Sequence, residues 1–347
     1  MMTTRELKEL LRILMEFDST SGKETNVANY LVHWLNNHNY TVINGESYLY
    51  AIPNNLTGNP IRAILCSHLD TVPPYLPYSE KLIGENNYMI HGRGACDAKG
   101  QIVSLIGASL SLQESNINNA LLFTYGEETE HCGIKKASAE LDLQADKVIV
   151  GEPTELKLMS TQKGCMSGTI ECFGKACHSG YPEYGNNALT RLMLNLLRVK
   201  EHPELTFNPI ISNGGEASNV VPSYAKAEFT VRSNLSCDKV KEILNTLWNL
   251  EFDYQTKVKW NSHTDPVQLS VDVGEDNNLL SNLEIEQAGF VTDLAYLKCK
   301  SNNGDNISPL KYLIGPGSIR DAHTNNEHIL LSDIIKAIDI YVLLARR

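Results

Sequence analysis

Three short apolar runs that end in acidic or imidazole side chains place the strongest constraint on this 347-residue chain. They read RAILCSHLD at residues 62–70, ALLFTYGEE at 120–128 and KVIVGEP at 147–153. Residues 63–66 are apolar on both faces, which is typical of a central strand in an α/β sheet. Open α/β sheets place their ligands at the carboxyl ends of the strands. We therefore expect a functional site built from the residues that end these three runs.

Helical and strand-like segments alternate around these runs. Helical patterns cover residues 5–16, 23–38, 100–114, 279–289 and a segment from Ser332. Further strand-like runs lie at residues 41–46, 48–53 and 311–315. This alternation predicts an α/β domain made from both ends of the chain.

Between residues 158 and 265 the pattern changes to half-exposed alternating strands and amphipathic helices. The order there is strand, helix, strand, helix, strand, at residues 166–180, 186–200, 223–234, 237–250 and 254–262. We interpret this block as a smaller α+β domain, inserted between residues 1–157 and 266–347 of the α/β domain. A length of 347 residues is consistent with two domains.

The composition argues against several partners. The formal charge is −11, from 30 basic and 41 acidic residues, without a basic cluster, so we do not expect nucleic acid to bind. Charges recur through the amphipathic N-terminal stretch, and no apolar run approaches the 18 or so residues of a membrane span, so we expect no membrane partner and a cytoplasmic protein. The eight cysteines form no CxxC pair. Cys66 and Cys96 lie beside proposed metal positions and are either soft ligands or small buried side chains.

Five residues, each at the end of an apolar run or in a turn, make a ligand set for two divalent metals. They are His68, Asp97, Glu128, Glu152 and His323. Imidazole and carboxylate ligands suit zinc or a similar first-row ion. A single histidine or acidic pair is more often hydrogen-bonded or solvated. Gathered at one sheet edge, however, these carboxylates would repel each other unless cations compensated them. The sequence thus predicts a metallohydrolase.

Five segments, in order and spacing, resemble the M20 family of dinuclear zinc hydrolases. They are SHLDTVPP (67–74), GRGACDAKG (92–100), the pair Glu127–Glu128, GEPTEL (151–156) and GPGSIRDAHTNNEH (315–328). The family includes acetylornithine deacetylases, succinyl-diaminopimelate desuccinylases and related carboxypeptidases. The resemblance implies a zinc-exopeptidase-like catalytic domain with a mixed β-sheet at 1–157 and 266–347. It also implies a ferredoxin-like lid at 158–265, through which the chain would form a homodimer.

The resemblance also implies roles for the metal ligands. Asp97 would bridge two divalent ions, zinc or alternatively cobalt. His68 and Glu152 would hold one ion, and Glu128 and His323 the other, which leaves each ion an open position. The peptide between Asp97 and Ala98 would be cis. Ala98 stands where many relatives carry Met, and the lid is compact, which favours a small substrate.

Catalytic roles follow from the same resemblance. Asp70 would fix the orientation of the His68 imidazole. Glu127 would be the general base that takes a proton from water and passes it to the leaving nitrogen. His178 matches the lid histidine that, in dimeric relatives, reaches the partner's site and helps to hold the oxyanion. The alternative for His178 is a hydrogen-bonded residue at a strand end.

Substrate contacts are carried over in the same way. Asn219 and Arg232 match lid residues that meet a substrate carboxylate, and Arg suits a bidentate grip. Gly315 and Gly317 match a backbone segment beside the substrate. A surface strand and a tight turn are the respective alternatives. Lys163 matches a basic position whose role stays open.

The resulting prediction is hydrolysis of the amide bond of a small N-acyl amino acid, with N-acetylornithine giving ornithine and acetate. Two alternatives within the family are a succinyl-amino-acid desuccinylase and a di- or carboxypeptidase. An alternative of another class is a non-catalytic metal-binding protein that has the same fold.

Overall fold

The computed structural model describes residues 2–85, 87–251, 253–274, 278–304 and 307–347. The chain divides into two compact units. Unit 1 comprises Met1–Ser160, Leu269–Glu286 and Thr292–Arg347. Unit 2 comprises Thr161–Gln268 and Gln287–Val291. The assignment of unit 2 as a lid stays a prediction.

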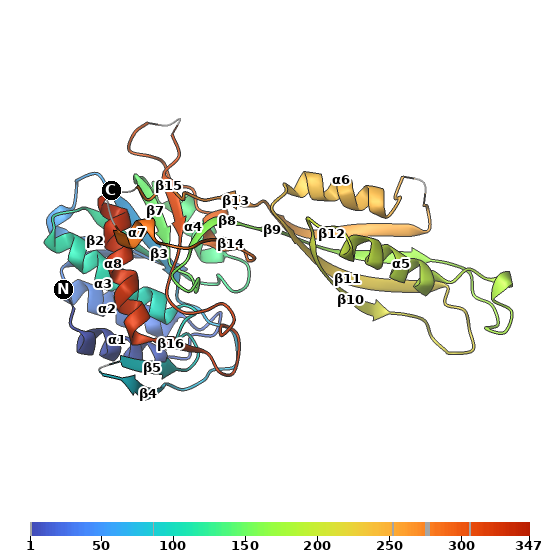
Figure 1. The fold of residues 1–347 in the computed structure, drawn as a ribbon, viewed down its shortest axis with the longest axis horizontal. Coiled ribbons are helices and arrows are strands. Elements are labelled where there is room, and N and C mark those ends of the chain that lie inside the picture. The colour runs from blue at the N-terminus through green and yellow to red at the C-terminus, as the bar shows by residue number, and fades with distance from the viewer. Residues whose placement is uncertain (1, 86, 252, 275–277, 305–306) are drawn as a thin grey trace. The chain divides into compact units, whose positions relative to one another are not determined.

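Unit 1 is built on a six-stranded mixed sheet (Figure 1). Its strand order is β1 (Tyr40–Asn44), β2 (Tyr48–Pro53), β6 (Asn119–Thr124), β3 (Ala63–His68), β7 (Lys147–Val150) and β15 (Leu310–Leu313). The last four strands run parallel, and β1 and β2 are antiparallel to their neighbours. Every residue of β3, β6 and β7 is buried, so the predicted α/β class with a mixed sheet is confirmed.

Helices cover this sheet because their apolar residues recur at helical spacing. The helices are α1 (Thr4–Glu16), α2 (Thr25–Asn37), α3 (Lys99–Glu114), α4 (Cys132–Glu140) and α8 (Leu331–Arg346). Helix α3 packs against β3 and β6 and also against α1 and α8, which explains why it is buried almost all round. Helix α1 begins with a capping box between Thr3 and Glu6. None of the described helices combines the length and the apolar content that a membrane crossing requires.

A second sheet of unit 1 joins two segments that are far apart in the sequence. It has the order β16 (His328–Leu330), β5 (Asn87–His91), β4 (Ser79–Gly84). His328 pairs with His91, so the end of β5 and the start of β16 lie side by side. The residues after β5 and those before β16 therefore meet, and both segments carry proposed metal ligands.

Unit 2 is a four-stranded antiparallel sheet with two helices on one face (Figure 1). Its sheet order is β10 (Thr206–Asn213), β11 (Tyr224–Ser233), β9 (Gly164–Phe173) and β12 (Thr256–Thr264), and its helices are α5 (Ala188–Lys200) and α6 (Cys237–Leu247). The chain order βαββαβ is the ferredoxin-like arrangement. The sequence missed β10, because this edge strand contains Pro209 and has almost no buried face.

The helix expected at residues 279–289 is wrong. Only α7 (Asn278–Ser281) is helical there, and β14 (Ile285–Ala288) is a strand. Strand β14 belongs to a three-stranded sheet, in which it pairs with β8 (Leu158–Gln162), and β8 pairs on its other side with β13 (Val267–Gln268). The backbone N–H of Leu158 donates to the oxygen of Glu284 at 2.9 Å. The open edge of β8 thus offers this segment a backbone ladder, which overrides the helical pattern.

Candidate metal centre and active site

The carboxyl ends of the parallel strands bring the proposed donors together. His68 is the last residue of β3, the pair Glu127–Glu128 follows β6, and Glu152 follows β7. Asp97 lies between β5 and α3, and His323 lies between β15 and β16. The proposed donors therefore meet at the sheet edge that the sequence indicated.

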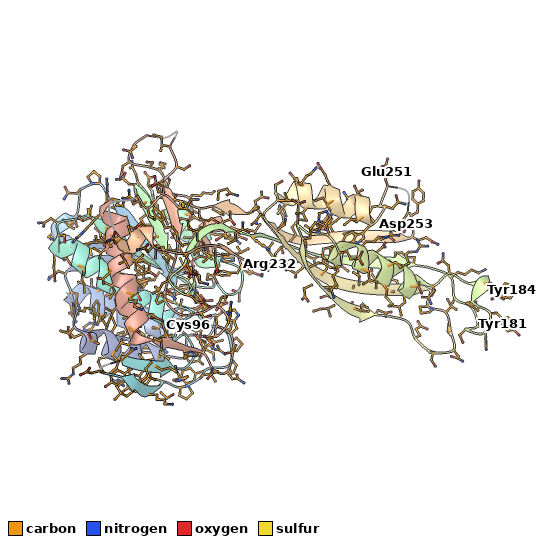
Figure 2. The ribbon with its side chains drawn as sticks, viewed as in Figure 1. Cys96, Tyr181, Tyr184, Arg232, Glu251 and Asp253 are labelled. Atoms are coloured by element: carbon orange, nitrogen blue, oxygen red, sulfur yellow. The ribbon has the colours of Figure 1, made fainter. Side chains whose placement is uncertain are left out.

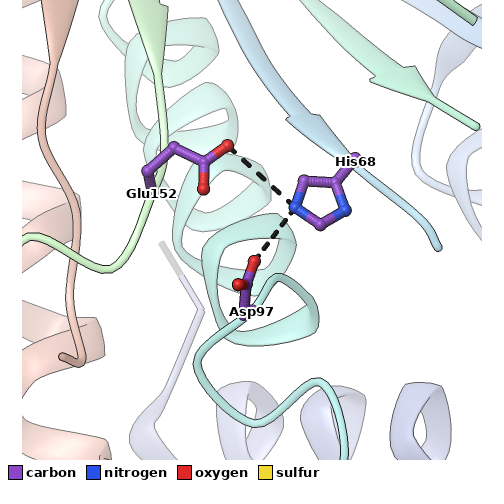
Figure 3. Close-up of side chains that lie close together, drawn as sticks. All are labelled: His68, Asp97 and Glu152. Carbon is purple, nitrogen blue, oxygen red and sulfur yellow. Dashed lines mark hydrogen bonds and ion pairs between the residues drawn. The ribbon is translucent and has the colours of Figure 1, made fainter. Parts of the chain in front are cut away.

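One group of donors consists of His68, Asp97 and Glu152, and all three side chains are buried (Figure 3). The Nε2 atom of His68 lies 3.0 Å from Oδ1 of Asp97 and 4.0 Å from Oε1 of Glu152. One atom from each side chain lies within 4.8 Å of the other two. A single ion could be held by all three.

A second group shares Asp97 with the first. The Nε2 atom of His323 lies 3.3 Å from Oδ2 of Asp97 and 2.9 Å from Oε1 of Glu128. The two oxygens of Asp97 thus face different groups, Oδ1 toward His68 and Oδ2 toward His323. This is the arrangement that a carboxylate bridging two ions needs. His323 is half-exposed, so the second group lies nearer to solvent than the first.

The electrostatics of the cluster call for positive charge. Burial raises the pKa values of Glu127, Glu128 and Glu152, and neighbouring carboxylates raise them further. Burial also acts to raise the pKa of Asp97, but hydrogen bonds from His323 and His68 hold it below its ordinary value. The same contacts with Asp97 and Glu128 raise the pKa of His323 to about 10. Protons or metal ions must therefore compensate these carboxylates.

The donor set fits divalent metal ions. The Nδ1 atom of His68 lies 3.0 Å from the backbone oxygen of Asp70, a geometry in which Nδ1–H donates. In that tautomer Nε2 turns a lone pair toward the oxygens of Asp97 and Glu152, and only a proton or a cation between them makes this contact favourable. Imidazole nitrogens and carboxylate oxygens, with three protein donors in each group, are the set that zinc and similar ions take.

The two cysteines beside the site belong to neither group. Burial raises the pKa values of the Cys66 and Cys96 thiols, and all eight cysteines are free. The Sγ atom of Cys96, labelled in Figure 2, lies 3.8 Å from the backbone oxygen of Ser318. The structure thus favours the interpretation of both as small buried side chains.

Asp70 connects the end of β3 to the turn after β6. Its fully buried carboxylate accepts the backbone N–H of Glu127 at Oδ1 (3.0 Å) and that of Glu128 at Oδ2 (3.1 Å). The hydroxyl of Ser21 also donates to Oδ2 at 2.8 Å. The same carboxylate lies 3.4 Å from Nδ1 of His68. Asp70 therefore holds the backbone of the proposed base and of one proposed ligand.

Two further residues near the proposed base were not singled out from the sequence. The Nδ1 atom of His131 lies 3.0 Å from Asp293 Oδ1 and 3.7 Å from Glu127 Oε1. Asp293 also accepts the hydroxyl of Thr124 at 2.5 Å. The spacing of four residues between Glu127 and His131 was a usable signal, but nothing local marks Asp293, which lies 162 residues from His131.

Gly315 and Gly317 lie against the segments that bear ligands. A Cβ atom at Gly315 would lie 2.4 Å from the backbone oxygen of Glu152, and one at Gly317 would lie 2.5 Å from Cβ of Cys96. Gly317 also has a φ of +79°, which favours glycine. Glycine thus permits the close approach of these segments. The peptide between Asp97 and Ala98 is cis, as the resemblance implies.

The remaining candidates lie in unit 2. His178 is exposed, and its Nδ1 accepts the backbone N–H of Gly180 at 3.0 Å. The backbone oxygen of Asn219 accepts the N–H of Ser179 at 2.9 Å, so His178 and Asn219 belong to two adjoining loops. Their roles toward a substrate stay predictions.

Arg232 lies on β11, as labelled in Figure 2. Its Nη1 atom is buried and has no hydrogen-bond partner in the described part of the chain. The neighbouring Lys163 donates from Nζ to the hydroxyl of Thr206 at 3.0 Å. A buried guanidinium nitrogen without an acceptor has the capacity to bind an anionic group.

Comparison with known proteins extends over both units. Residues 64–347 match the sequence model of peptidase family M20/M25/M40. A protein of Talaromyces marneffei named as a probable carboxypeptidase is 32% identical over 392 residues, which cover 97% of this chain and 85% of that protein. A tripeptidase structure from Staphylococcus aureus has a TM-score of 0.81 at 19% identity and covers 100% of both chains. A Bacillus subtilis structure described as a dinuclear metal-binding peptidase of the M20 family has a TM-score of 0.70 at 14% identity, covering 99% of this chain and 97% of that one.

Proposed function

This chain belongs to peptidase family M20/M25/M40 and is a hydrolase of that family, and we propose that it cleaves the amide bond of small peptides or N-acyl amino acids that carry a free carboxylate. The observation that carries the proposal is the pair of donor groups that share Asp97. His68 and Glu152 would hold one divalent ion, and Glu128 and His323 the other. Zinc suits these ligands best, with cobalt as the alternative.

Two divalent ions in this site would polarise the scissile carbonyl and lower the pKa of a water molecule. The chain's own residues supply the rest of the chemistry. Glu127 is the proposed proton acceptor, because Asp70 fixes its backbone beside Glu128 while its carboxylate stays out of both donor groups. Glu127 would return the proton to the leaving nitrogen. Burial of His68, Asp97 and Glu152 keeps bulk water from that group and strengthens each electrostatic contact within it.

The substrate class follows from charge and from the relatives. The unpartnered nitrogen of Arg232 supports a substrate with a carboxylate, and the resemblance assigns Asn219 to the same group. His178 would help to hold the oxyanion, and this role requires the homodimer that the resemblance implies. The names of the Talaromyces and Staphylococcus proteins favour a short peptide as the substrate. N-acetylornithine is the narrower proposal from the sequence, and these names do not favour it.

The test is release of free amine by protein loaded with zinc or cobalt. The panel contains dipeptides, tripeptides, N-acetylornithine, succinyl-ornithine and succinyl-diaminopimelate, and metal content is measured on the same samples. We expect turnover of at least one compound with two ions bound per chain. Protein that holds two ions but turns over nothing in the panel would instead favour the non-catalytic alternative.

Glu127→Gln separates chemistry from metal binding. We expect this variant to lose turnover by a factor of about 10² to 10⁴, the usual range for removing a general base, while it keeps both ions. Equal turnover by the variant and the wild type would exclude Glu127 as the base. Sedimentation velocity of the wild type tests the homodimer separately.

A further inference from the structure

A buried ion pair contacts the backbone of the two segments that carry Asp97 and His323. Arg93 and Glu327 are each only 1% exposed, and Nη1 of Arg93 donates to Oε2 of Glu327 at 2.6 Å. The other oxygen of Glu327, Oε1, accepts the backbone N–H groups of Cys96 at 3.2 Å and Asp97 at 3.1 Å. Glu327 therefore holds the backbone of the residue that both donor groups share.

The same pair holds the segment that carries His323. Nη1 of Arg93 also donates to the backbone oxygen of Thr324, the residue after His323, at 3.3 Å. The backbone oxygen of Glu327 accepts the N–H of Gly92 at 3.1 Å, next to the pairing of β5 with β16. The Asp97 segment and the His323 segment are thus joined through one side-chain pair.

The pair's position is not explained by stability alone. Burying two charges carries a desolvation cost that their attraction often fails to recover, so an apolar pair of similar volume would serve the core about as well. A carboxylate that accepts two consecutive backbone N–H groups does something that no apolar side chain can do. It fixes the direction in which Asp97 leaves the backbone.

We infer that Glu327 and Arg93 are positioning residues of the metal centre, which set Asp97 between the two donor groups and keep His323 in register with it. This inference rests on the dinuclear centre of the proposed function. It predicts that removing the pair weakens the binding of the two ions unequally. The group formed by Asp97, Glu128 and His323 loses two positioned donors when the pair is removed, whereas the group of His68, Asp97 and Glu152 loses one.

The experiment is a cobalt titration of metal-free protein, followed by visible absorption and by competition with a chelator. Because partners behind metal ligands typically contribute ten- to hundredfold to affinity, we expect Glu327→Ala to weaken one of the two cobalt-binding steps by that factor and the other by less. The spectrum of this variant with one cobalt bound should match that of His323→Ala, which removes a donor of the second group directly.

A paired variant separates positioning from loss of folding. Arg93→Met combined with Glu327→Gln removes both buried charges but keeps a side-chain oxygen for the N–H groups of Cys96 and Asp97. We expect this variant to bind the ion of His68, Asp97 and Glu152 within about threefold of the wild type. The other binding step should weaken less than in Glu327→Ala, because the Asp97 backbone keeps its acceptor and only the bond from Arg93 to Thr324 is lost. Leu35→Ala serves as the matched control. Leu35 is fully buried in α2, which packs against β1 and β2, and neither strand carries a proposed ligand. This change therefore destabilises unit 1 but should spare both binding steps.

Three outcomes would overturn the inference. Glu327→Ala could keep both steps at wild-type affinity, the paired variant could bind as weakly as Glu327→Ala, or Leu35→Ala could lose the same step. A wild type that binds one cobalt ion or none would overturn the dinuclear centre as well. Failure of the proposed reaction gives a different result, because the wild type would then bind two cobalt ions but release no amine from the substrates.

Discussion

Asp70→Asn is the substitution for which the structure gives the clearest expectation. The wild-type carboxylate accepts the backbone N–H groups of Glu127 and Glu128 on different oxygens, and Ser21 donates to one of them. Asparagine has the same shape but only one oxygen. Whichever way its amide is turned, its NH₂ group must face a backbone N–H, and that buried donor loses its acceptor.

The magnitude follows from these contacts. A buried donor left without an acceptor costs about 1–3 kcal/mol, and hydrogen bonds to a charged group lie at the upper end of the usual range. Removing the charge of Asp70 recovers little free energy from its burial. Burial acts to raise the pKa of Asp70, yet the hydrogen bond with His68 and the other donors hold it below its ordinary value, so the folded protein favours the ionised form. We expect unfolding of unit 1 to become easier by about 2–3 kcal/mol. Turnover should fall about ten- to hundredfold.

Hydrogen exchange measures the first effect on unit 1 alone. Amides of residues 63–68 lie in the central strand β3, so their slowest exchange reports the free energy of opening that unit. Ser21→Ala is the matched control, because it removes one donor from the same carboxylate without leaving a buried N–H unpaired, and it should cost about 1.5 kcal/mol, the lower end for a bond to a charged group. Exchange in Asp70→Asn that equals the wild type, or a larger loss in Ser21→Ala, would refute the reasoning.

Two further expectations concern the frame of the site. Burial and the neighbouring Arg62 lower the pKa of Lys147 to about 8, so below pH 8 the folded protein holds a charge that it disfavours by about 3 kcal/mol relative to an ordinary pKa of 10.5. Because the unfolded chain binds the extra proton, stability should rise from pH 8 to about pH 10.5, and Lys147→Met should raise the stability at pH 7 by about 2 kcal/mol and flatten this rise in urea unfolding curves. A less stable Lys147→Met protein at pH 7 would contradict this account. Gly315→Ala should lower the stability by about 1–3 kcal/mol and weaken binding of the ion proposed for His68 and Glu152, because its Cβ would lie 2.2 Å from Gln101 and 2.4 Å from the backbone oxygen of Glu152. Gly289→Ala, with open space around it, should change neither thermal unfolding nor resistance to a chelator.

The central sheet was predictable because its signal is local. Residues 63–66 and 147–150 are continuous apolar runs, and a run that is buried on both faces has few alternatives to a central strand. Because these strands run parallel, their carboxyl ends lie at the same edge of the sheet. His68 and Glu152 follow from these facts alone. Asp97 belongs to a loop that no periodicity describes, and its bridging role came only from the family resemblance.

The residues that were missed act through contacts distant in the sequence. Arg93 and Glu327 are 234 residues apart, and each reads locally as a charged side chain near a turn. The strand β14 was misread because its partner β8 precedes it by more than a hundred residues, and backbone pairing leaves no mark on side-chain periodicity. Interactions of this kind become visible only once the two segments are placed side by side.

Asp70 and Glu327 make the same kind of contact with two different segments that carry proposed metal ligands. Each is a buried carboxylate that accepts two consecutive backbone N–H groups, those of Glu127 and Glu128 in one case and those of Cys96 and Asp97 in the other. In each case the second residue of the pair is a proposed metal ligand, and the contact is made to its backbone rather than to its donor atoms. The ligand's position is thus set by the folding of unit 1, before an ion arrives, while its carboxylate stays available. An ion that enters such a frame has to order few side chains, so more of the attraction between ion and carboxylates remains as binding free energy.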